Sequence, residues 1–265
     1  MSYRLERSQV QQRAVRVLKD YQINKLPINP KEVAAKAGIS VLPKNDCEPG
    51  VSGMLLRNGE NFGILYATYL NNPGFENFSI AHELGHYFLD GHPEQVFKNS
   101  NIHASTAEFV TSDLIEREAD TFAASLLMPE DIFKDQLSRF EKGFTCIEAM
   151  AKLCNTSLTA TAIRYAELTE DMVVIIVSKN NIVEFCCISN NVFKLKEIEK
   201  PKKGDKIPKD TATEAITNNP ALLVKSEVRY AETRFIDWLE CRSSRVAAEE
   251  AIGLGKYGKV LTVIS

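Results

Sequence analysis

The chain has 265 residues, of which 44% are hydrophobic and 25% are charged, and its formal net charge is −3. This composition predicts a globular protein of two or three domains. The small negative charge argues against a surface that binds nucleic acid over most of its area, but it does not exclude a local basic patch. The longest apolar run, residues 172–177, is too short to span a bilayer and the charged N-terminus predicts no secretory signal, so we expect a cytoplasmic protein without membrane contact.

The N-terminal region predicts two helices followed by a β-hairpin. Apolar residues recur at helical spacing over residues 10–21, and Asn29-Pro30 predicts the start of a second, short helix. Asn58-Gly59 is a strong hairpin turn signal. A strand of this hairpin can border a cleft and pair with an extended peptide, but the sheet interior is an equally good interpretation. The strands are predicted over residues 39–42, 51–56 and 62–66.

Residues 82–86, His-Glu-Leu-Gly-His, form a two-histidine metal motif that includes a carboxylate. Residues four apart share one face of a helix, so His82 and His86 can reach the same zinc ion. Glu83 can reach a water at an open coordination position and act as general base. The motif therefore predicts a hydrolytic zinc site, in which manganese could substitute in vitro. The alternative is an amphipathic helix with two surface histidines.

Residues 116–120, Glu-Arg-Glu-Ala-Asp, offer the third ligand that such a site needs. Glu116 and Asp120 share one face of a predicted helix, and Glu116 can complete a set of two histidines and one glutamate. Asp120, one turn later, can accept a hydrogen bond from the free ring nitrogen of a ligand histidine. Glu118 points to another face and is a weaker ligand candidate. The alternative is an acidic helix start favoured by the helix dipole.

The connection between the two motifs, residues 92–113, is rich in Ser, Thr and Asn. A long connection beside a catalytic site is often a lid or a substrate-binding loop. It contains the two remaining histidines, His92 and His103. Either could stabilise an oxyanion during hydrolysis, but a solvated loop histidine is the commoner case, and we expect that role for both.

The two motifs, with the apolar residues that follow each, resemble the ImmA/IrrE family of metallopeptidases. The resemblance implies that His82, His86 and Glu116 bind zinc and that Glu83 is the base. Many members carry a histidine where Asp90 stands or just beyond, a departure that leaves this ligand set intact. The resemblance covers roughly the first two thirds of the chain, with matching segments at residues 26–34, 51–53, 82–89, 116–129 and 157–165.

The same resemblance implies a regulatory endopeptidase with a zincin-like fold. Its protein substrate would be a helix-turn-helix repressor, and cleavage of that repressor would activate stress-response or mobile-element genes. Nothing in the residues themselves encodes the substrate.

Residues 145–168 predict two helices joined by a turn, which is a helix-turn-helix pattern. The second helix offers Arg164 and two threonines but little other chemistry for reading bases, so packing beside the peptidase domain is preferred to DNA binding. Tyr165 is a further catalytic candidate, because its hydroxyl could donate to a tetrahedral intermediate. The alternative function is a non-proteolytic regulator or anti-repressor that binds DNA or a repressor through residues 145–168.

After residue 170 the sequence predicts a module similar to a GAF-type sensor fold, which could receive a small-molecule or a protein signal. Its predicted strands are residues 172–177, 182–188, 235–241 and 259–264, with a helical stretch after a Lys-rich loop at residues 200–209. We therefore expect an α+β chain with three parts. These are a zincin-like metallopeptidase domain (1–136), a helical, helix-turn-helix-like segment (137–169), and an α/β GAF-like sensor or interaction domain (170–265).

Overall fold

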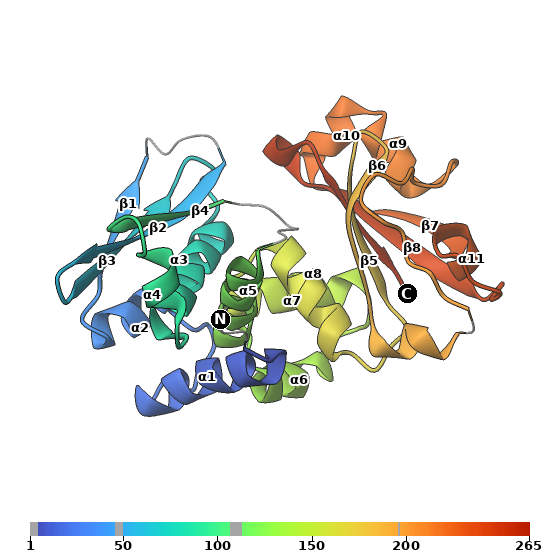
Figure 1. The fold of residues 1–265 in the computed structure, drawn as a ribbon. Coiled ribbons are helices and arrows are strands. Elements are labelled where there is room, and N and C mark those ends of the chain that lie inside the picture. The colour runs from blue at the N-terminus through green and yellow to red at the C-terminus, as the bar shows by residue number, and fades with distance from the viewer. Residues whose placement is uncertain (1–4, 46–49, 107–112, 196) are drawn as a thin grey trace. The chain divides into compact units, whose positions relative to one another are not determined.

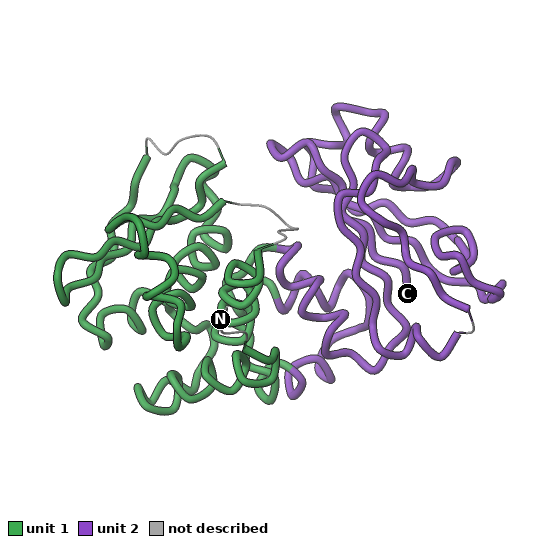
Figure 2. The backbone as a smooth tube through the Cα atoms, in the orientation of Figure 1, with its two compact units in different colours: residues 1–133, 151–157 green, residues 134–150, 158–265 purple. Residues whose placement is uncertain are grey.

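The computed structural model describes residues 5–45, 50–106, 113–195 and 197–265. It divides the chain into two compact units, of which unit 1 comprises residues 1–133 and 151–157 and unit 2 the remainder (Figure 2). Each unit combines helices with a β-sheet, which confirms the α+β class (Figure 1). The three-domain division stays a prediction. No helix in the described part of the chain is long and apolar enough to cross a membrane.

The sheet of unit 1 contains the predicted hairpin in its interior. Its strands are β1 (Ser40–Lys44), β2 (Val51–Asn58), β3 (Asn61–Ala67) and β4 (Ile102–Thr106). Among the described residues they lie in the order β1-β3-β2-β4, so β1 and β4 form the edges. β1 runs parallel to β3, whereas the other pairs are antiparallel. Gly59 closes the hairpin with a φ of 63°, a left-handed conformation that glycine adopts without strain.

Two central helices of unit 1 carry the sequence motifs. α3 (Pro73–Phe88) packs against β2 and β3, and α5 (Leu114–Leu127) packs against α3. Both helices begin at a polar cap, because Asn72 accepts a hydrogen bond from the Phe75 N–H and Asp113 accepts one from the Ile115 N–H. The other helices that begin in this unit are α1 (Arg7–Asp20), α2 (Pro30–Lys36), α4 (His92–Val96) and α6 (Glu130–Leu137).

Unit 2 is built on an antiparallel sheet of five described strands, β5 (Val174–Lys179), β6 (Ile182–Ile188), β7 (Arg229–Arg234), β8 (Val246–Gly253) and β9 (Val260–Ile264). Their order is β6-β5-β9-β8-β7. α9 (Ala212–Thr217) and α10 (Pro220–Lys225) pack against β8, and α11 (Phe235–Trp238) contributes Phe235 and Trp238 to an apolar cluster. The likeness to a GAF-type fold stays a prediction.

The remaining helical elements are α7 (Phe144–Cys154) and α8 (Leu158–Leu168), which confirm the two helices predicted over residues 145–168. Two short 3₁₀ turns, η1 (Asn190–Lys194) and η2 (Gly255–Tyr257), lie in unit 2.

One prediction for the C-terminal region is wrong, and one strand was missed. The strand expected at residues 235–241 begins instead with helix α11, and the strand is β7, which ends at Arg234. β8 was not predicted, because its Ala- and Glu-rich sequence favours a helix. It forms a strand because Glu249 is fully buried and accepts hydrogen bonds from the Ala212 and Thr213 N–H groups at the start of α9. Tertiary contacts override the local propensity here.

Candidate metal centre

α3 carries His82, Glu83 and His86 into the interior of unit 1, between the sheet and α5. Their exposed fractions are 6%, 0% and 0%. Long polar side chains are rarely this buried without a partner. The predicted alternative of an amphipathic helix with two surface histidines is therefore wrong, and the motif faces the protein interior.

The two imidazoles of α3 meet the Glu116 carboxylate of α5. The Nε2 atoms of His82 and His86 lie 3.1 Å apart. Glu116 Oε2 lies 3.2 Å from His82 Nε2, and Oε1 lies 3.4 Å from His86 Nε2. One ligand atom from each residue lies within 4.8 Å of the other two, a spacing that suits a metal ion. Two imidazoles and one carboxylate form the donor set of several catalytic zinc sites, so these residues fit the metal that the sequence predicts.

Glu83 lies beside this triad with an unusual lack of partners. Neither carboxylate oxygen makes a hydrogen bond of ordinary geometry with the described residues, although the side chain is fully buried and the Ser105 side chain is near enough to lower the pKa of Glu83. Burial raises the pKa of Glu83 to about 7, against the lowering effect of the nearby His82. Buried polar groups are otherwise almost always satisfied, so an orphaned carboxylate at this position indicates a functional partner such as a water or a substrate.

Asp120 contacts the Nδ1 edge of the His82 ring, with its Oδ1 2.8 Å from His82 Nδ1. This contact leaves His82 Nε2 directed at Glu116. Burial lowers the pKa of His82, but hydrogen bonds to Asp120 and Glu116 outweigh it and hold this pKa at about 10. Burial lowers the pKa of His86 to about 3. Burial raises the pKa of Glu116, yet hydrogen bonds from His103, His82 and His86 hold it well below its usual range.

The prediction that His92 and His103 are solvated loop residues is wrong. His92 is 1% exposed, and its Nδ1 lies 3.2 Å from His86 Nδ1. Its Nε2 lies 3.0 Å from Oε2 of Glu118, the residue that we ranked as a weaker ligand candidate. His103 Nε2 lies 3.1 Å from Glu116 Oε1. All four histidines of the chain therefore form one continuous network with the carboxylates of α5.

The connection between the motifs is more ordered than the sequence suggests. It contains α4 and the edge strand β4, whereas residues 107–112 of the predicted lid lie outside the described residues. In β4, His103 pairs with the buried Leu55 of β2, so both side chains lie on the sheet face that α3 covers. The edge strand beside the candidate site is therefore β4, whereas the predicted hairpin forms sheet interior and reaches the site only through β2.

Arg164 and Tyr165 lie in unit 2 and are both 2% exposed. The Tyr165 hydroxyl accepts a hydrogen bond from the Gly143 N–H at 3.4 Å, and burial raises the pKa of this phenol. Arg164 pairs with Glu167 of the same helix at 3.0 Å. The catalytic role expected for Tyr165 stays a prediction, and the one arginine available to read bases is engaged inside the protein.

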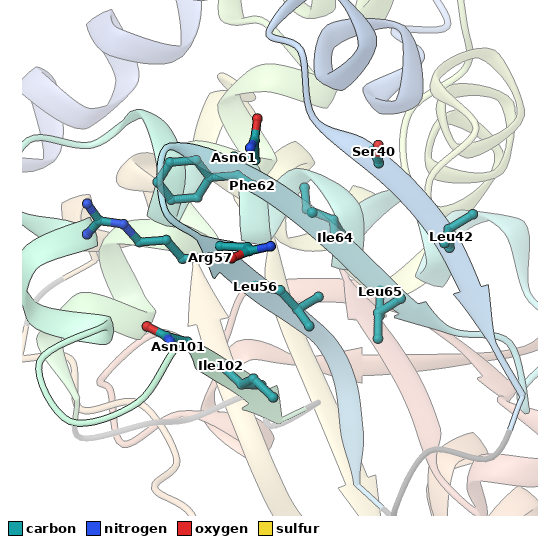
Figure 3. Close-up of a pocket in the computed structure, with 12 residues that line it drawn as sticks. Ser40, Leu42, Leu56, Arg57, Asn61, Phe62, Ile64, Leu65, Asn101 and Ile102 are labelled. Atoms are coloured by element: carbon teal, nitrogen blue, oxygen red, sulfur yellow. The ribbon is translucent and has the colours of Figure 1, made fainter.

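The other face of the unit 1 sheet carries an apolar hollow of about 420 Å³ (Figure 3). Leu42, Leu56, Leu65 and Ile102 line it, and Leu42 and Ile102 are well exposed. None of the histidines or carboxylates of the candidate metal centre contributes to its lining. The hollow is thus separate from the polar network under α3.

Comparison with known proteins places this geometry in a family. Residues 34–164 match the IrrE N-terminal-like domain. A stretch of 97 residues is 29% identical to the radiation response metalloprotease IrrE of Deinococcus radiodurans. That match covers 37% of this chain and 29% of the length of the relative.

The fold also resembles a solved structure, a transcriptional regulator of Mycobacterium tuberculosis. The TM-score is 0.61 at 12% sequence identity, over 96% of this chain and 75% of that one. This likeness concerns the fold alone. The matched domain contains both sequence motifs and the whole histidine–carboxylate network, and residues 34–164 therefore form a domain of the ImmA/IrrE family of metallopeptidases.

Proposed function

We propose that the chain is a zinc-dependent regulatory endopeptidase that cleaves a protein substrate, a helix-turn-helix repressor. The observation that carries this proposal is the convergence of His82, His86 and Glu116 next to the buried carboxylate of Glu83, which makes no hydrogen bond of ordinary geometry with the described residues. A structural zinc site would usually be closed by four protein ligands, whereas three ligands beside a free carboxylate suit hydrolysis.

Zinc bound by these three residues would lower the pKa of a water and polarise the scissile carbonyl. Glu83 takes the proton from the attacking water and returns it to the leaving amine, which is the usual task of a carboxylate beside such a ligand set. Asp120 holds the His82 ring so that Nε2 faces Glu116. Burial of Glu83 keeps bulk water away from the base and strengthens its interaction with the reacting atoms.

The edge strand β4 supports an extended polypeptide as substrate. Its outer edge has no neighbouring strand among the described residues, and it carries His103 and Ser105 on the face that α3 covers. An extended peptide can pair with such an edge through its main chain, which would bring a scissile bond to the metal centre. The repressor as substrate rests on the family resemblance.

The experiment is incubation of the zinc-loaded protein with helix-turn-helix repressors from its own organism, beginning with any that is encoded beside its gene, followed by mass analysis of the products. The wild type should yield two fragments, and Glu83→Gln should yield none. Glu94→Gln, an exposed glutamate on α4, serves as the matched control and should cleave normally. An intact repressor after incubation with the folded, zinc-loaded wild type would contradict the proposal.

The remaining alternative is an anti-repressor that binds the repressor without cutting it. In that case wild type and Glu83→Gln would release the repressor from DNA equally, and no fragment would form. DNA binding through residues 145–168 has little support, because Arg164 is buried and paired with Glu167.

A further inference from the structure

His82 and His86 differ in the group that contacts Nδ1, the ring nitrogen that faces away from His82 Nε2, His86 Nε2 and Glu116. Asp120 contacts Nδ1 of His82 directly, and 40% of its side chain is exposed. His86 Nδ1 instead faces a second histidine, His92, at 3.2 Å. His92 in turn contacts Glu118, so Nδ1 of His86 reaches a carboxylate only through an intervening ring.

This arrangement requires a specific backbone path. Helix α3 ends at Phe88, and Gly91 has a φ of 80°, a left-handed conformation that suits glycine. The chain then turns into α4, and the His92 N–H bonds to the Leu89 carbonyl at 3.2 Å. His92 thereby returns to α3, with its ring centroid 5.3 Å from that of His86.

The protons can be assigned from the contacts. If His86 presents the lone pair of Nε2 to a metal ion, its ring proton lies on Nδ1 and is donated to His92 Nδ1. His92 then carries its own proton on Nε2 and donates it to Glu118 Oε2 at 3.0 Å. The other oxygen of Glu118 accepts the Leu5 N–H at 3.1 Å. Each ring nitrogen of His92 thus has one partner of the correct kind.

We propose that His92 and Glu118 form a buried relay that fixes the orientation and tautomer of His86, which makes both of them positioning residues for the metal centre. The relay rests on the proposed function in one respect, because it assumes that His86 binds the metal through Nε2. Removal of a hydrogen-bond partner of a ligand histidine usually lowers metal affinity about 10- to 100-fold. The relay is well protected, because His92 is 1% and Glu118 9% exposed.

The test is zinc affinity, measured by competition with a chromogenic chelator on folded protein and without any substrate. His92→Ala and Glu118→Ala should each weaken zinc binding about 10- to 100-fold. Glu118→Gln keeps an acceptor for the His92 proton without the charge, so its loss should be smaller than that of Glu118→Ala. Glu94→Ala, an exposed change on the same short helix as His92, should bind zinc like the wild type.

A double variant separates a relay from general damage to the fold. If His92 and Glu118 act in series on His86, His92→Ala combined with Glu118→Ala should bind zinc no more weakly than His92→Ala alone. The visible absorption spectrum of the cobalt-loaded protein should change in the single variants as well, because a reoriented His86 ring alters the ligand field at the cobalt ion. Multiplied losses in the double variant, or wild-type affinity in both folded single variants, would overturn the relay.

The outcome also separates the relay from the peptidase proposal. If the wild type cleaves no repressor but zinc affinity depends on His92, the relay stands and the peptidase proposal fails. If cleavage occurs and zinc affinity is unchanged in the His92 and Glu118 variants, the peptidase proposal stands and the relay fails.

Discussion

Gly53 of β2 lies against the proposed base, and Gly53→Ala tests whether the position of Glu83 controls the reaction. A Cβ at this position would lie 2.7 Å from Glu83 Oε1, 3.1 Å from Cγ and 3.3 Å from Cδ. Oε1 must therefore retreat by about 0.7 Å to reach the 3.4 Å at which ordinary contact begins. Because Glu83 is fully buried, its side chain has no solvent-filled space into which to move.

The magnitude follows from this displacement. A misplacement of about 1 Å at a catalytic group can cost roughly 100-fold in rate, so we expect kcat to fall about 10- to 100-fold. Zinc affinity should change little, because Glu83 is not one of the ligands. The free energy of unfolding should fall by about 1–3 kcal/mol, the usual cost of overpacking. Peptide cleavage, chelator competition and urea unfolding measure the three quantities separately.

Gly63→Ala is the matched control on the neighbouring strand β3. A Cβ there would meet only the Ser40 carbonyl oxygen, at an ordinary 3.7 Å, so both rate and zinc affinity should stay near wild type. In a Glu83→Ala background, Gly53→Ala should lose its stability cost because the clash is gone. Full activity in Gly53→Ala, or an undiminished stability cost in the double variant, would refute the reasoning.

Four other predictions use separate measurements. Glu83→Gln should lower the cleavage rate at least about 100-fold and leave zinc affinity nearly unchanged, whereas Glu116→Ala should remove tight zinc binding in a chelator titration. Glu249→Ala leaves the Ala212 and Thr213 N–H groups without their buried acceptor and should lower the free energy of unfolding by roughly 3 kcal/mol in urea. Burial raises the pKa of Glu250 from 4.5, so its contribution to stability is fully present below pH 4.5 and is lost as the pH rises through the folded-state pKa. Glu250→Gln retains an acceptor for the Phe144 N–H, so the stability of this variant relative to wild type should increase from pH 4 to pH 8. A stability difference that stays constant over this pH range would contradict the raised pKa of Glu250.

The sequence was most informative where a local rule applied. The motif at residues 82–86 indicated which residues share a helix face, and α3 has that geometry. Asn29-Pro30 and Asn58-Gly59 predicted a helix start and a hairpin, and α2 and the β2–β3 turn follow them. In each case the residues that decide the conformation lie within a few positions of one another.

The histidines outside the motif could not be placed in this way. His92 follows His86 by six residues, across the end of α3 and a left-handed glycine, and no helical or strand period relates the two rings. His103 reaches Glu116 because β4 pairs with β2 and orients its inward side chains toward α3. Both placements depend on tertiary pairing, and a histidine within a Ser- and Asn-rich stretch gives no sign of it.

Gly85 shows how one motif position links the two helices. A Cβ on Gly85 would lie 3.1 Å from Ala119 Cα and 3.2 Å from its carbonyl oxygen, so α3 and α5 cross with little more than backbone between them. Ala119 lies between Glu118 and Asp120, the partners of His92 and His82. The close crossing thus sets the depth at which α5 presents its carboxylates to both histidines of the motif. A larger residue at either small position would separate the helices and weaken both supports together, although it would touch neither imidazole.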